Sequence, residues 1–176
     1  MERERLVAEL SAHGIRFLAG GADADMNVPA RAPSELIAAL AQHRDPRLRS
    51  ALTSLFLLHS DWGADVPRVA QILEGAARIE LCARYMAAVY LQRMWRTRLG
   101  FYLADFSLLP DYFSAALGLP PADERFGKPG LHALAEWHAR RSEFPYNRVA
   151  SYEKALELLI GQLKAEARHH EFAAAR

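Results

Sequence analysis

The chain has 176 residues, of which 51% are hydrophobic and 24% charged, and its formal net charge at pH 7 is +1. This length fits one domain whose core needs neither metals nor disulfides, and a single cysteine, Cys82, excludes an internal disulfide framework or a cysteine-based zinc site. The near-neutral charge provides no overall field that would draw the chain to nucleic acid or anionic lipid.

The residue usage predicts an all-α fold. Alanine (32 residues) and leucine (25 residues) dominate, whereas valine, isoleucine and threonine together number 13. Because β-branched residues favour strands and lose side-chain freedom in helices, this ratio favours helices over sheet. We therefore expect one α-helical domain over residues 1–176, a bundle of about eight helices with no sheet of three or more strands.

The first third of the chain predicts a helix, an irregular loop and a helical hairpin. A first helix is expected to end near Gly14, and residues 19–33, rich in glycine, aspartate and proline, to form a loop. Residues 34–59 then resemble one HEAT-type hairpin, with Ser34 and Asp45 as the N-caps of its two helices. No second copy follows at a fixed period, so a solenoid is not predicted.

The middle of the chain predicts the helix around which the others pack. A short helix beginning near Asp65 is expected to turn Ile72 inward. A long helix over about 76–99 follows, and it is apolar on nearly two faces, which is typical of a central helix. We expect Cys82 and Met86 to be buried within it.

Prolines divide the last third of the chain. Pro110 and Pro121 flank a short predicted helix, and Pro129 opens the next one, at a position where a missing N–H costs nothing. A final helix is predicted over about 148–168, and the tail at 168–176 is expected to fray.

The sequence contains no predicted membrane or export segment. No stretch of roughly 18 uncharged apolar residues exists, which is the length that a spanning helix needs. The nearest candidate, residues 81–94, contains Arg84, Gln92 and Arg93. The N-terminal residues lack the apolar run of a signal peptide. We therefore expect a cytoplasmic protein that does not enter a membrane.

A glycine pair followed by two aspartates imitates a nucleotidyltransferase motif. Those enzymes hold Mg²⁺ on an Asp-x-Asp pair, because carboxylates are hard oxygen ligands. Here Gly20 and Gly21 are nearly adjacent to Asp23 and Asp25 in sequence, whereas a helical stretch separates the glycines from the aspartates in that family. No sheet is predicted around them either. We interpret these carboxylates as solvated loop residues.

The seven histidines do not form a predicted metal site. His132 and His138 are six residues apart on a predicted helix, so they point in different directions, unlike an i, i+4 metal-binding pair. His13, His43 and His59 each fall near a helix C-terminus, where an imidazole interacts with the exposed carbonyls. No metal and no cofactor is predicted.

The spacing of one arginine and one histidine resembles the motif of a helical ribonuclease. Enzymes of the HEPN class carry an arginine, four to six residues and then a histidine on one helix, and Arg125 and His132 have six residues between them. However, residues 126–130 include two glycines and a proline, which favour a loop over a helix. Short motifs match by accident, so catalysis from this pair is not expected.

A cluster of basic and aromatic residues at the end of the long helix is the strongest candidate for a binding site. Its members are Tyr90, Arg93, Trp95, Arg96 and Arg98. A phosphate could bridge Arg93 and Arg96, and the rings could stack on a base or on a partner's side chain. Alternatively, the arginine stems cover aromatic core and pair with acids such as Asp105 and Asp111. The structural alternative is favoured.

Four segments carry a resemblance to known sequences. They are residues 90–95 (YLQRMW), 109–114 (LPDYFS), 117–120 (LGLP) and 151–153 (SYE). Together they make the chain similar to a group of uncharacterised bacterial helical proteins that are often encoded beside small nucleotidyltransferases. The resemblance implies an accessory role with a partner protein. No catalytic motif defines the group, so it transfers no functional residue.

Three hypotheses about function remain open at this point. The first is a non-catalytic helical protein that acts with a partner protein, such as a nucleotidyltransferase, or with a second copy of itself. The second is a protein that binds or cleaves nucleic acid through residues 93–98. The third is a small-molecule binder whose apolar pocket lies between helices, with Tyr85, Tyr90 and Trp95 pointing into it.

Overall fold

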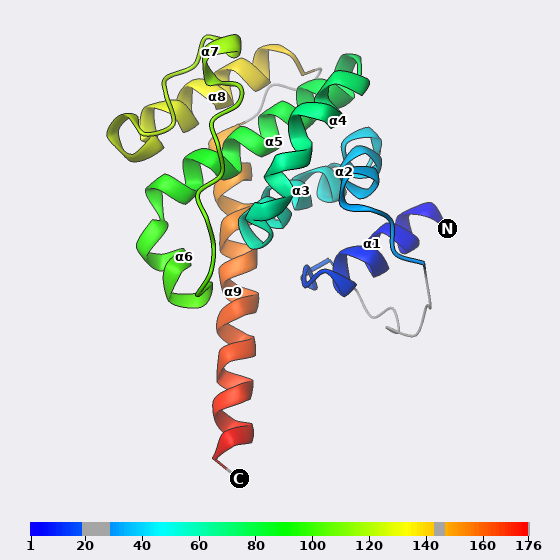
Figure 1. Ribbon diagram of the computed structural model, residues 1–176, viewed down its shortest axis with the longest axis vertical. Helices are drawn as coiled ribbons and strands as arrows, with labels where there is room; N and C mark the ends of the chain where they lie inside the picture. The colour runs from blue at the N-terminus through cyan, green and yellow to red at the C-terminus, as the bar shows by residue number, and fades with distance from the viewer. Residues whose placement is uncertain (19–28, 143–146, 176) are drawn as a thin grey trace.

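The computed structural model of the chain describes residues 1–18, 29–142 and 147–175, and every regular element within these ranges is helical (Figure 1). The α-helices are α1 (Glu2–Ala12), α2 (Pro33–Gln42), α3 (Pro46–Leu58), α4 (Val66–Ile72), α5 (Gly75–Met94), α6 (Arg96–Tyr102), α7 (Ser114–Leu117), α8 (Lys128–Arg140) and α9 (Arg148–Ala174), and the 3-10 helices are η1 (Ser60–Asp65) and η2 (Glu124–Gly127). The prediction of an all-α domain is confirmed. Most of the predicted loop at 19–33 lies outside the described residues.

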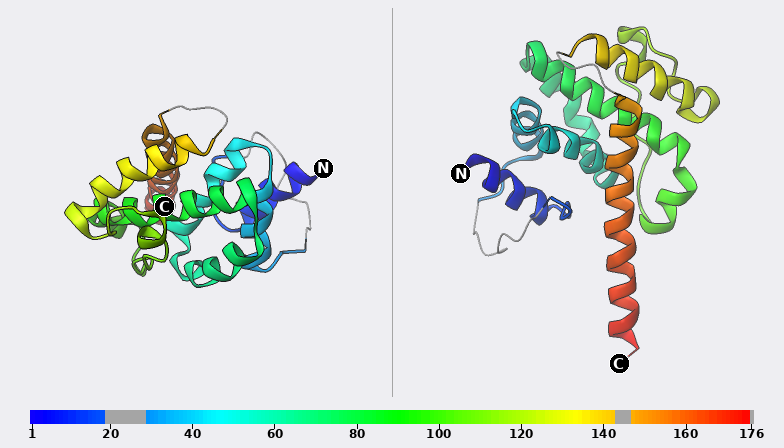
Figure 2. Two further views of the ribbon diagram at one scale, coloured as in Figure 1. Left: turned by 90° about the horizontal axis from the view of Figure 1, so that it is seen from above. Right: turned by 180° about the vertical axis from the view of Figure 1, so that it is seen from behind.

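Helix α5 occupies the centre of the bundle, as its two apolar faces predict. It contacts α2, α3, α4, α8 and α9, and every residue from Glu80 to Gln92 is buried. The expected burial of Cys82 and Met86 is confirmed. In the view from above, α5 runs across the molecule with the other helices on both sides of it (Figure 2).

The predicted long helix over 76–99 is wrong in its second part. Helix α5 ends at Met94, and Trp95 leaves the helical conformation with φ −119° and ψ 25°. The chain then turns into α6 (Figure 1), which packs against α5 and α9. The turn returns Leu99 to the core and places it fully out of solvent. A straight continuation would have carried Leu99 away from the domain.

The hairpin of α2 and α3 is present, and one of its two predicted caps is correct. Asp45 caps α3 through a side-chain hydrogen bond to the first turn. Ser34 is not the N-cap of α2, because the helix begins at Pro33, with Ala32 as its N-cap. The Glu35 carboxylate accepts the Ala32 N–H at 3.2 Å. The fixed φ of a proline at the first helical position accounts for the earlier start.

Two expectations about shorter elements also need correction. Ile72 is 71% exposed, because α4 begins at Val66 and turns Val66, Val69 and Ala70 inward, which leaves Ile72 off the buried face. The helix predicted between the prolines is one turn, Ser114–Leu117. Pro129 lies in the first turn of α8, as expected.

Helix α9 is longer than predicted. It runs to Ala174 instead of ending near residue 168, so the predicted tail at 168–176 is helical as far as Ala174. Its first half packs against α3, α5, α6 and α8, and its second half projects away from the other helices (Figures 1 and 2). None of the helices described is long and apolar enough to cross a membrane.

Candidate interaction groove and buried polar network

A groove of about 710 Å³ lies where α5 ends and α6 begins, and four of the five predicted binding residues line it. The residues that form it, called the α5–α6 groove below, are Arg93, Met94, Trp95, Arg96, Thr97, Arg98, Leu108, Asp123 and Phe126. The groove therefore combines three arginines with two aromatic rings. One carboxylate, from Asp123, lies among them.

Two arginines of the α5–α6 groove are tied to the protein. The Arg93 guanidinium donates to the Leu109 carbonyl at 2.8 Å and to Asp123 Oδ1 at 3.2 Å, and its side chain is only 11% exposed. Arg98 Nη1 lies 2.8 Å from Glu157 Oε1 on α9. The expected partner acids were Asp105 and Asp111, and this expectation is wrong for Arg93 and Arg98. The structural role that the sequence favoured holds for both arginines, with different acids.

The remaining side chains of the groove are available to solvent. Arg96 is exposed and makes no side-chain hydrogen bond or ion pair with another described residue. Trp95 is 37% exposed, and the Arg98 guanidinium carbon lies 5.8 Å from the centre of its ring. A cation at this distance over an aromatic face is attracted to it. The free charge of Arg96 and the open face of Trp95 are the features that a ligand would meet.

Tyr90, the fifth predicted residue, is not part of the groove. Its ring is fully buried, and its hydroxyl donates to the Pro120 carbonyl at 2.7 Å. The ring packs so closely on Gly130 that no Cβ atom fits there. Burial also raises the pKa of the Tyr90 hydroxyl. Tyr85 is likewise buried, and its hydroxyl donates to the Pro110 carbonyl, so neither tyrosine ring lines the α5–α6 groove.

Phe126 is a residue of the groove that the sequence interpretation missed. Its side chain is 79% exposed, although large apolar side chains are usually buried. Arg125 and Phe126 adopt left-handed backbone conformations, with φ of 43° and 58°. A residue other than glycine in this conformation costs about 1–2 kcal/mol of folding free energy. Gly127 fixes the turn, since a Cβ atom there would lie 2.7 Å from the Tyr90 carbonyl oxygen.

A second polar constellation lies inside the domain, where α5, α8 and α9 meet. His138 Nε2 lies 2.8 Å from Glu80 Oε1, and His138 Nδ1 lies 2.7 Å from the Tyr152 hydroxyl. Both His138 and Tyr152 are fully buried. These distances are consistent with a neutral imidazole that donates to the carboxylate and accepts from the phenol. Burial lowers the pKa of His138, although its hydrogen bond to Glu80 opposes that effect.

Two arginines complete the charge balance of this network. Arg84 Nε donates to Glu80 Oε2 at 3.2 Å, its Nη1 lies 3.4 Å from Ser151 Oγ, and Arg49 Nε lies 3.8 Å from the same carboxylate. Burial alone would raise the pKa of Glu80, but the hydrogen bond from His138 and the charges of the arginines lower it to about 2. Glu80 is therefore ionised at neutral pH.

The buried network resembles a proton relay in its residue types but not in its access to solvent. A general base must reach the proton that it removes, whereas Glu80, His138 and Tyr152 are each less than 10% exposed. Buried polar groups that hydrogen-bond to one another across helices instead specify one arrangement of these helices. The sequence analysis did not identify this network, although the i, i+4 spacing of Glu80 and Arg84 is a signal that could have indicated one of its pairs. The contacts from α8 and α9 depend on the fold.

The other motifs take the positions that the sequence suggests, as far as they are described. His132 is exposed and His138 is buried, so the two diverge as expected. Arg125 lies on the left-handed turn before α8, so it does not share a helix with His132. Asp23 and Asp25 lie outside the described residues. Among those described, no three His, Cys, Asp or Glu side chains form a group that could hold a metal.

The predicted helix-end positions of three histidines are confirmed. His13, His43 and His59 are the C-cap residues of α1, α2 and α3. His59 Nε2 lies 2.7 Å from the carbonyl oxygen of His13, so the imidazole of one helix end satisfies the exposed carbonyl of another. These contacts join α1 to α3 and leave the two rings with structural roles.

No protein-family model, curated protein or solved structure gives a match to this chain. The similarity to bacterial helical proteins encoded beside nucleotidyltransferases stays a prediction. The geometry of the described residues, and not a relative, is the basis of the functional argument.

Proposed function

We propose that this chain is a non-catalytic helical interaction protein of the cytoplasm that binds a partner protein through the α5–α6 groove. The observation that carries the proposal is the pair of exposed rings, Trp95 and Phe126, beside the unpaired Arg96. Tryptophan, phenylalanine and arginine are enriched at protein interfaces, and tryptophan and arginine dominate their binding energy. A protein segment that presents an apolar side chain and a carboxylate complements this set.

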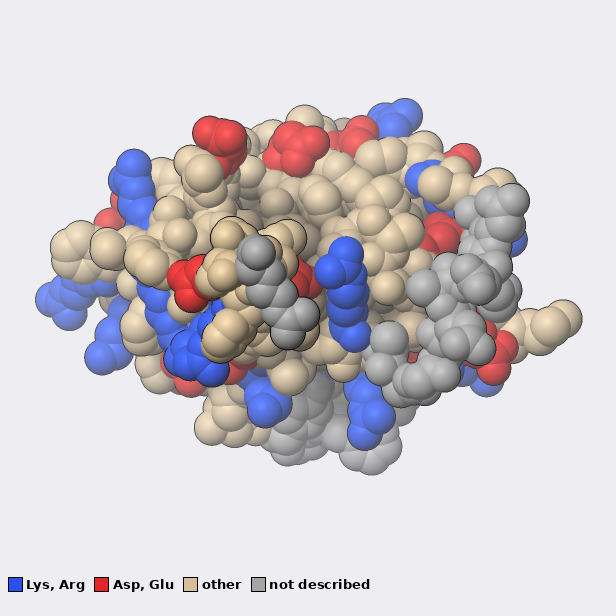
Figure 3. Space-filling model, turned by 90° about the horizontal axis from the view of Figure 1, so that it is seen from below, with Lys and Arg blue, Asp and Glu red and all other residues tan. Residues whose placement is uncertain are grey.

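The charge of the groove favours a protein over a nucleic acid. Arg93 pairs with Asp123 and Arg98 with Glu157, which leaves Arg96 as the cation of the groove without an acidic partner among the described residues. Binding to a phosphate backbone depends on several cations that displace counterions. On the face seen from below, lysine and arginine side chains are interspersed with acidic and uncharged residues (Figure 3).

The turn that carries Phe126 supports a binding role for its ring. Two consecutive residues in strained conformations hold an apolar side chain that is 79% exposed. Strain of this kind is typical of sites that contact a ligand. A partner that covers Phe126 would recover part of the free energy of the exposed ring, at about 25 cal/mol per Å² of apolar surface.

The sequence resemblance suggests which partner to test first. It favours a small nucleotidyltransferase encoded beside the gene for this chain. Self-association through the same groove is the alternative, and light scattering of the purified protein distinguishes the two. A monomer that binds the nucleotidyltransferase supports the first choice.

The test replaces Phe126 in living cells with a photo-crosslinking phenylalanine analogue. We expect one dominant adduct with a partner protein from position 126. The matched control places the analogue at Ile72, which is also highly exposed but ends α4, away from the groove. Equal adducts from both positions, or none from position 126, would contradict the proposal.

A binding measurement with the purified partner quantifies the same contact. Trp95→Ala and Phe126→Ala should each weaken binding at least tenfold, because truncation of a central aromatic typically costs about 2 kcal/mol or more. A titration with RNA and single-stranded DNA at two salt concentrations tests the rival hypothesis. Tight binding that falls steeply with salt, and is lost in Arg96→Ala, would favour nucleic acid instead.

A further inference from the structure

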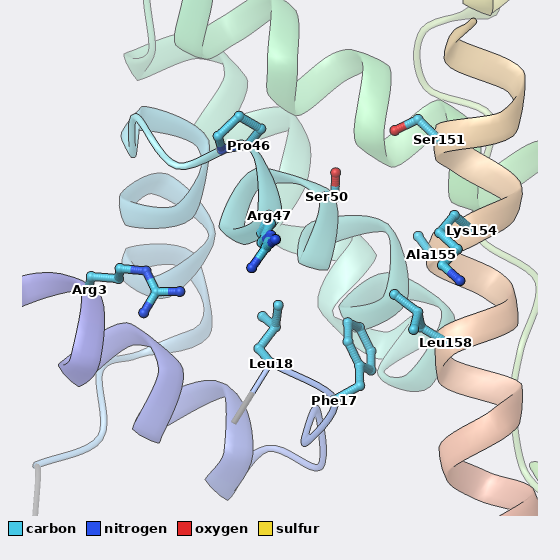
Figure 4. A pocket seen from close by; sticks show the side chains of 10 residues that line it. All are labelled: Arg3, Phe17, Leu18, Pro46, Arg47, Ser50, Ser151, Lys154, Ala155 and Leu158. Atoms are coloured by element: carbon cyan, nitrogen blue, oxygen red, sulfur yellow. The ribbon is translucent and has the colours of Figure 1, made fainter. Parts of the chain in front are cut away.

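A second hollow, separate from the α5–α6 groove, lies between α1, α3 and α9. It has a volume of about 440 Å³, within the usual range of small-molecule pockets. Side chains from four parts of the chain converge on it: α1, the segment after α1, the first turns of α3 and the first half of α9 (Figure 4). These four parts of the chain are distant from one another in sequence. Tertiary packing therefore creates the pocket.

One side of the pocket is apolar. Phe17 and Leu18 rise from the segment after α1, and Leu158 approaches them from α9 (Figure 4). Leu158 is 36% exposed although α9 buries its neighbours Leu156 and Leu159. An apolar side chain left at the edge of a hollow, instead of in the core, supplies surface that a ligand can cover.

The other side of the pocket is cationic. Arg3, Arg47 and Lys154 line it, and no acidic side chain of the described residues does. Arg3 donates to Asp45 at 2.9 Å, which holds it in place. The side chains of Arg47 and Lys154 are exposed and make no hydrogen bond or ion pair with another described residue. Two uncompensated positive charges therefore face an apolar wall across one cavity.

The pocket also contains two hydroxyl groups, and the buried network orients one of them. Ser50 and Ser151 lie on α3 and α9 (Figure 4). Ser151 Oγ accepts from Arg84 Nη1 at 3.4 Å, and Arg84 is held in turn by Glu80. Because Ser151 accepts this hydrogen bond, its own O–H is available as a donor toward the cavity.

We propose that this pocket binds a small organic anion that has an apolar body and one carboxylate or phosphate head group. The head group pairs with Arg47 and Lys154 and accepts from Ser151, and the apolar body lies against Phe17, Leu18 and Leu158. Charge-assisted hydrogen bonds give the head group its affinity. The site is independent of the partner groove, so either can exist without the other.

The test compares four probes by isothermal titration: decanoate, decyl phosphate, decanol and inorganic phosphate. We expect both amphipathic anions to bind, and the tighter of the two identifies the head group. Decanol lacks the charge and inorganic phosphate lacks the apolar body, so each should bind at least tenfold more weakly. Equal affinity for decanol and decanoate, or no binding of either anion, would overturn the proposal.

Variants locate the bound anion. Arg47→Ala with Lys154→Ala should weaken binding of the amphipathic anions at least tenfold, and Leu158→Asp should abolish it. The matched control, Arg44→Ala with Lys164→Ala, removes the same two residue types from exposed positions outside the pocket. An equal loss in the control would indicate nonspecific attraction and contradict the assignment. Retained partner binding in the pocket variants separates this test from that of the groove.

Discussion

The middle and the C-terminal end of helix α5 carry similar residues in opposite settings. In the middle, the Arg84 guanidinium carbon lies 5.6 Å from the ring centre of Tyr152, and just beyond the end of the helix that of Arg98 lies 5.8 Å from Trp95. Arg84 and Tyr152 are buried, whereas Trp95 is partly exposed. An arginine beside an aromatic ring therefore does not by itself indicate a binding site. The surrounding helices decide its role.

The difference in setting predicts a difference in energetic role. Charged groups out of water interact strongly, and removal of one partner leaves the other uncompensated. Exposed ion pairs contribute about 0–1 kcal/mol, because water and salt screen them. The network around Glu80 should thus set the stability of the domain. The exposed side chains of the groove, Trp95, Arg96 and Phe126, should tolerate substitution and affect mainly binding.

The largest expected effect comes from Glu80→Ala. This change removes the carboxylate that pairs with His138 and Arg84 and leaves a buried arginine without its acid. Loss of one partner of a buried pair costs about 3–5 kcal/mol. For a domain of this size the melting temperature should fall by roughly 10 °C. Thermal unfolding followed by circular dichroism measures it.

The matched control for Glu80→Ala is Glu136→Ala. Glu136 pairs with Arg140 one turn away on α8, but both side chains are more than 70% exposed. The control should change the free energy of unfolding by less than about 0.5 kcal/mol. Similar losses at positions 80 and 136 would show that burial does not separate the two kinds of pair.

Acid should destabilise the protein by protonating the Glu80 carboxylate. The pKa of Glu80 falls from its ordinary 4.5 to about 2 in the folded chain, so the folded state resists a proton that the unfolded chain accepts. Its contribution is complete above pH 4.5 and is lost as pH falls toward 2, by roughly 3 kcal/mol at most. The pKa of His138 is also lowered from its ordinary 6.5. The unfolded chain therefore takes up this proton more readily, and the free energy of unfolding also declines as the pH falls below 6.5.

Denaturant unfolding at several pH values tests this dependence. Glu80→Gln removes the titrating group but keeps an acceptor for His138 Nε2. Between pH 4.5 and pH 3, the free energy of unfolding should therefore decline less steeply in the variant than in the unchanged protein. Parallel curves would mean that the folded-state pKa of Glu80 is close to its ordinary value.

A smaller effect separates two arginines of the groove. Arg93→Ala leaves the Leu109 carbonyl and Asp123 without their donor, and should cost about 1–2 kcal/mol. Arg96→Ala removes an exposed side chain without such partners and should change stability by less than about 0.5 kcal/mol. Urea unfolding of the two single variants measures the difference. Equal losses of unfolding free energy would mean that Arg96 supports the fold as Arg93 does.

The sequence predicted the fold class and the central helix because both depend on local properties. Helix propensity and a two-faced apolar pattern identified α5, and Asp45 before Pro46 identified the start of α3. The end of α5 was not predictable in this way. Residues 95–99 contain no proline or glycine, and the turn at Trp95 accompanies the burial of Leu99 and the packing of α6 against α9.

The candidate sites were harder to predict than the helices, since their residues are distant in sequence. Arginines 93, 96 and 98 were found because they adjoin one another, but Asp123 and Phe126 reach the groove from the turn before α8. Tyr90 shares the sequence neighbourhood and is nevertheless buried. Side-chain direction at the end of a helix depends on its neighbours, and a single sequence does not specify them.

Phe126→Gly should not destabilise the protein. Most substitutions destabilise a protein, but glycine adopts the left-handed conformation at φ 58° without the strain of a side chain. The lost ring is 79% exposed and contributes little to the core. Relief of about 1 kcal/mol of strain, set against the greater freedom of glycine when unfolded, leaves stability between unchanged and about 1 kcal/mol higher.

The same change at Phe101, which is 81% exposed but lies in α6, should instead destabilise the protein by roughly 1 kcal/mol, because glycine weakens helices. If the turn exists to present the ring, Phe126→Gly should also lose partner binding while Phe101→Gly keeps it. A destabilised Phe126→Gly protein would mean that the ring supports the fold, and the exposed surface at the end of α5 would then resemble the buried network around its middle.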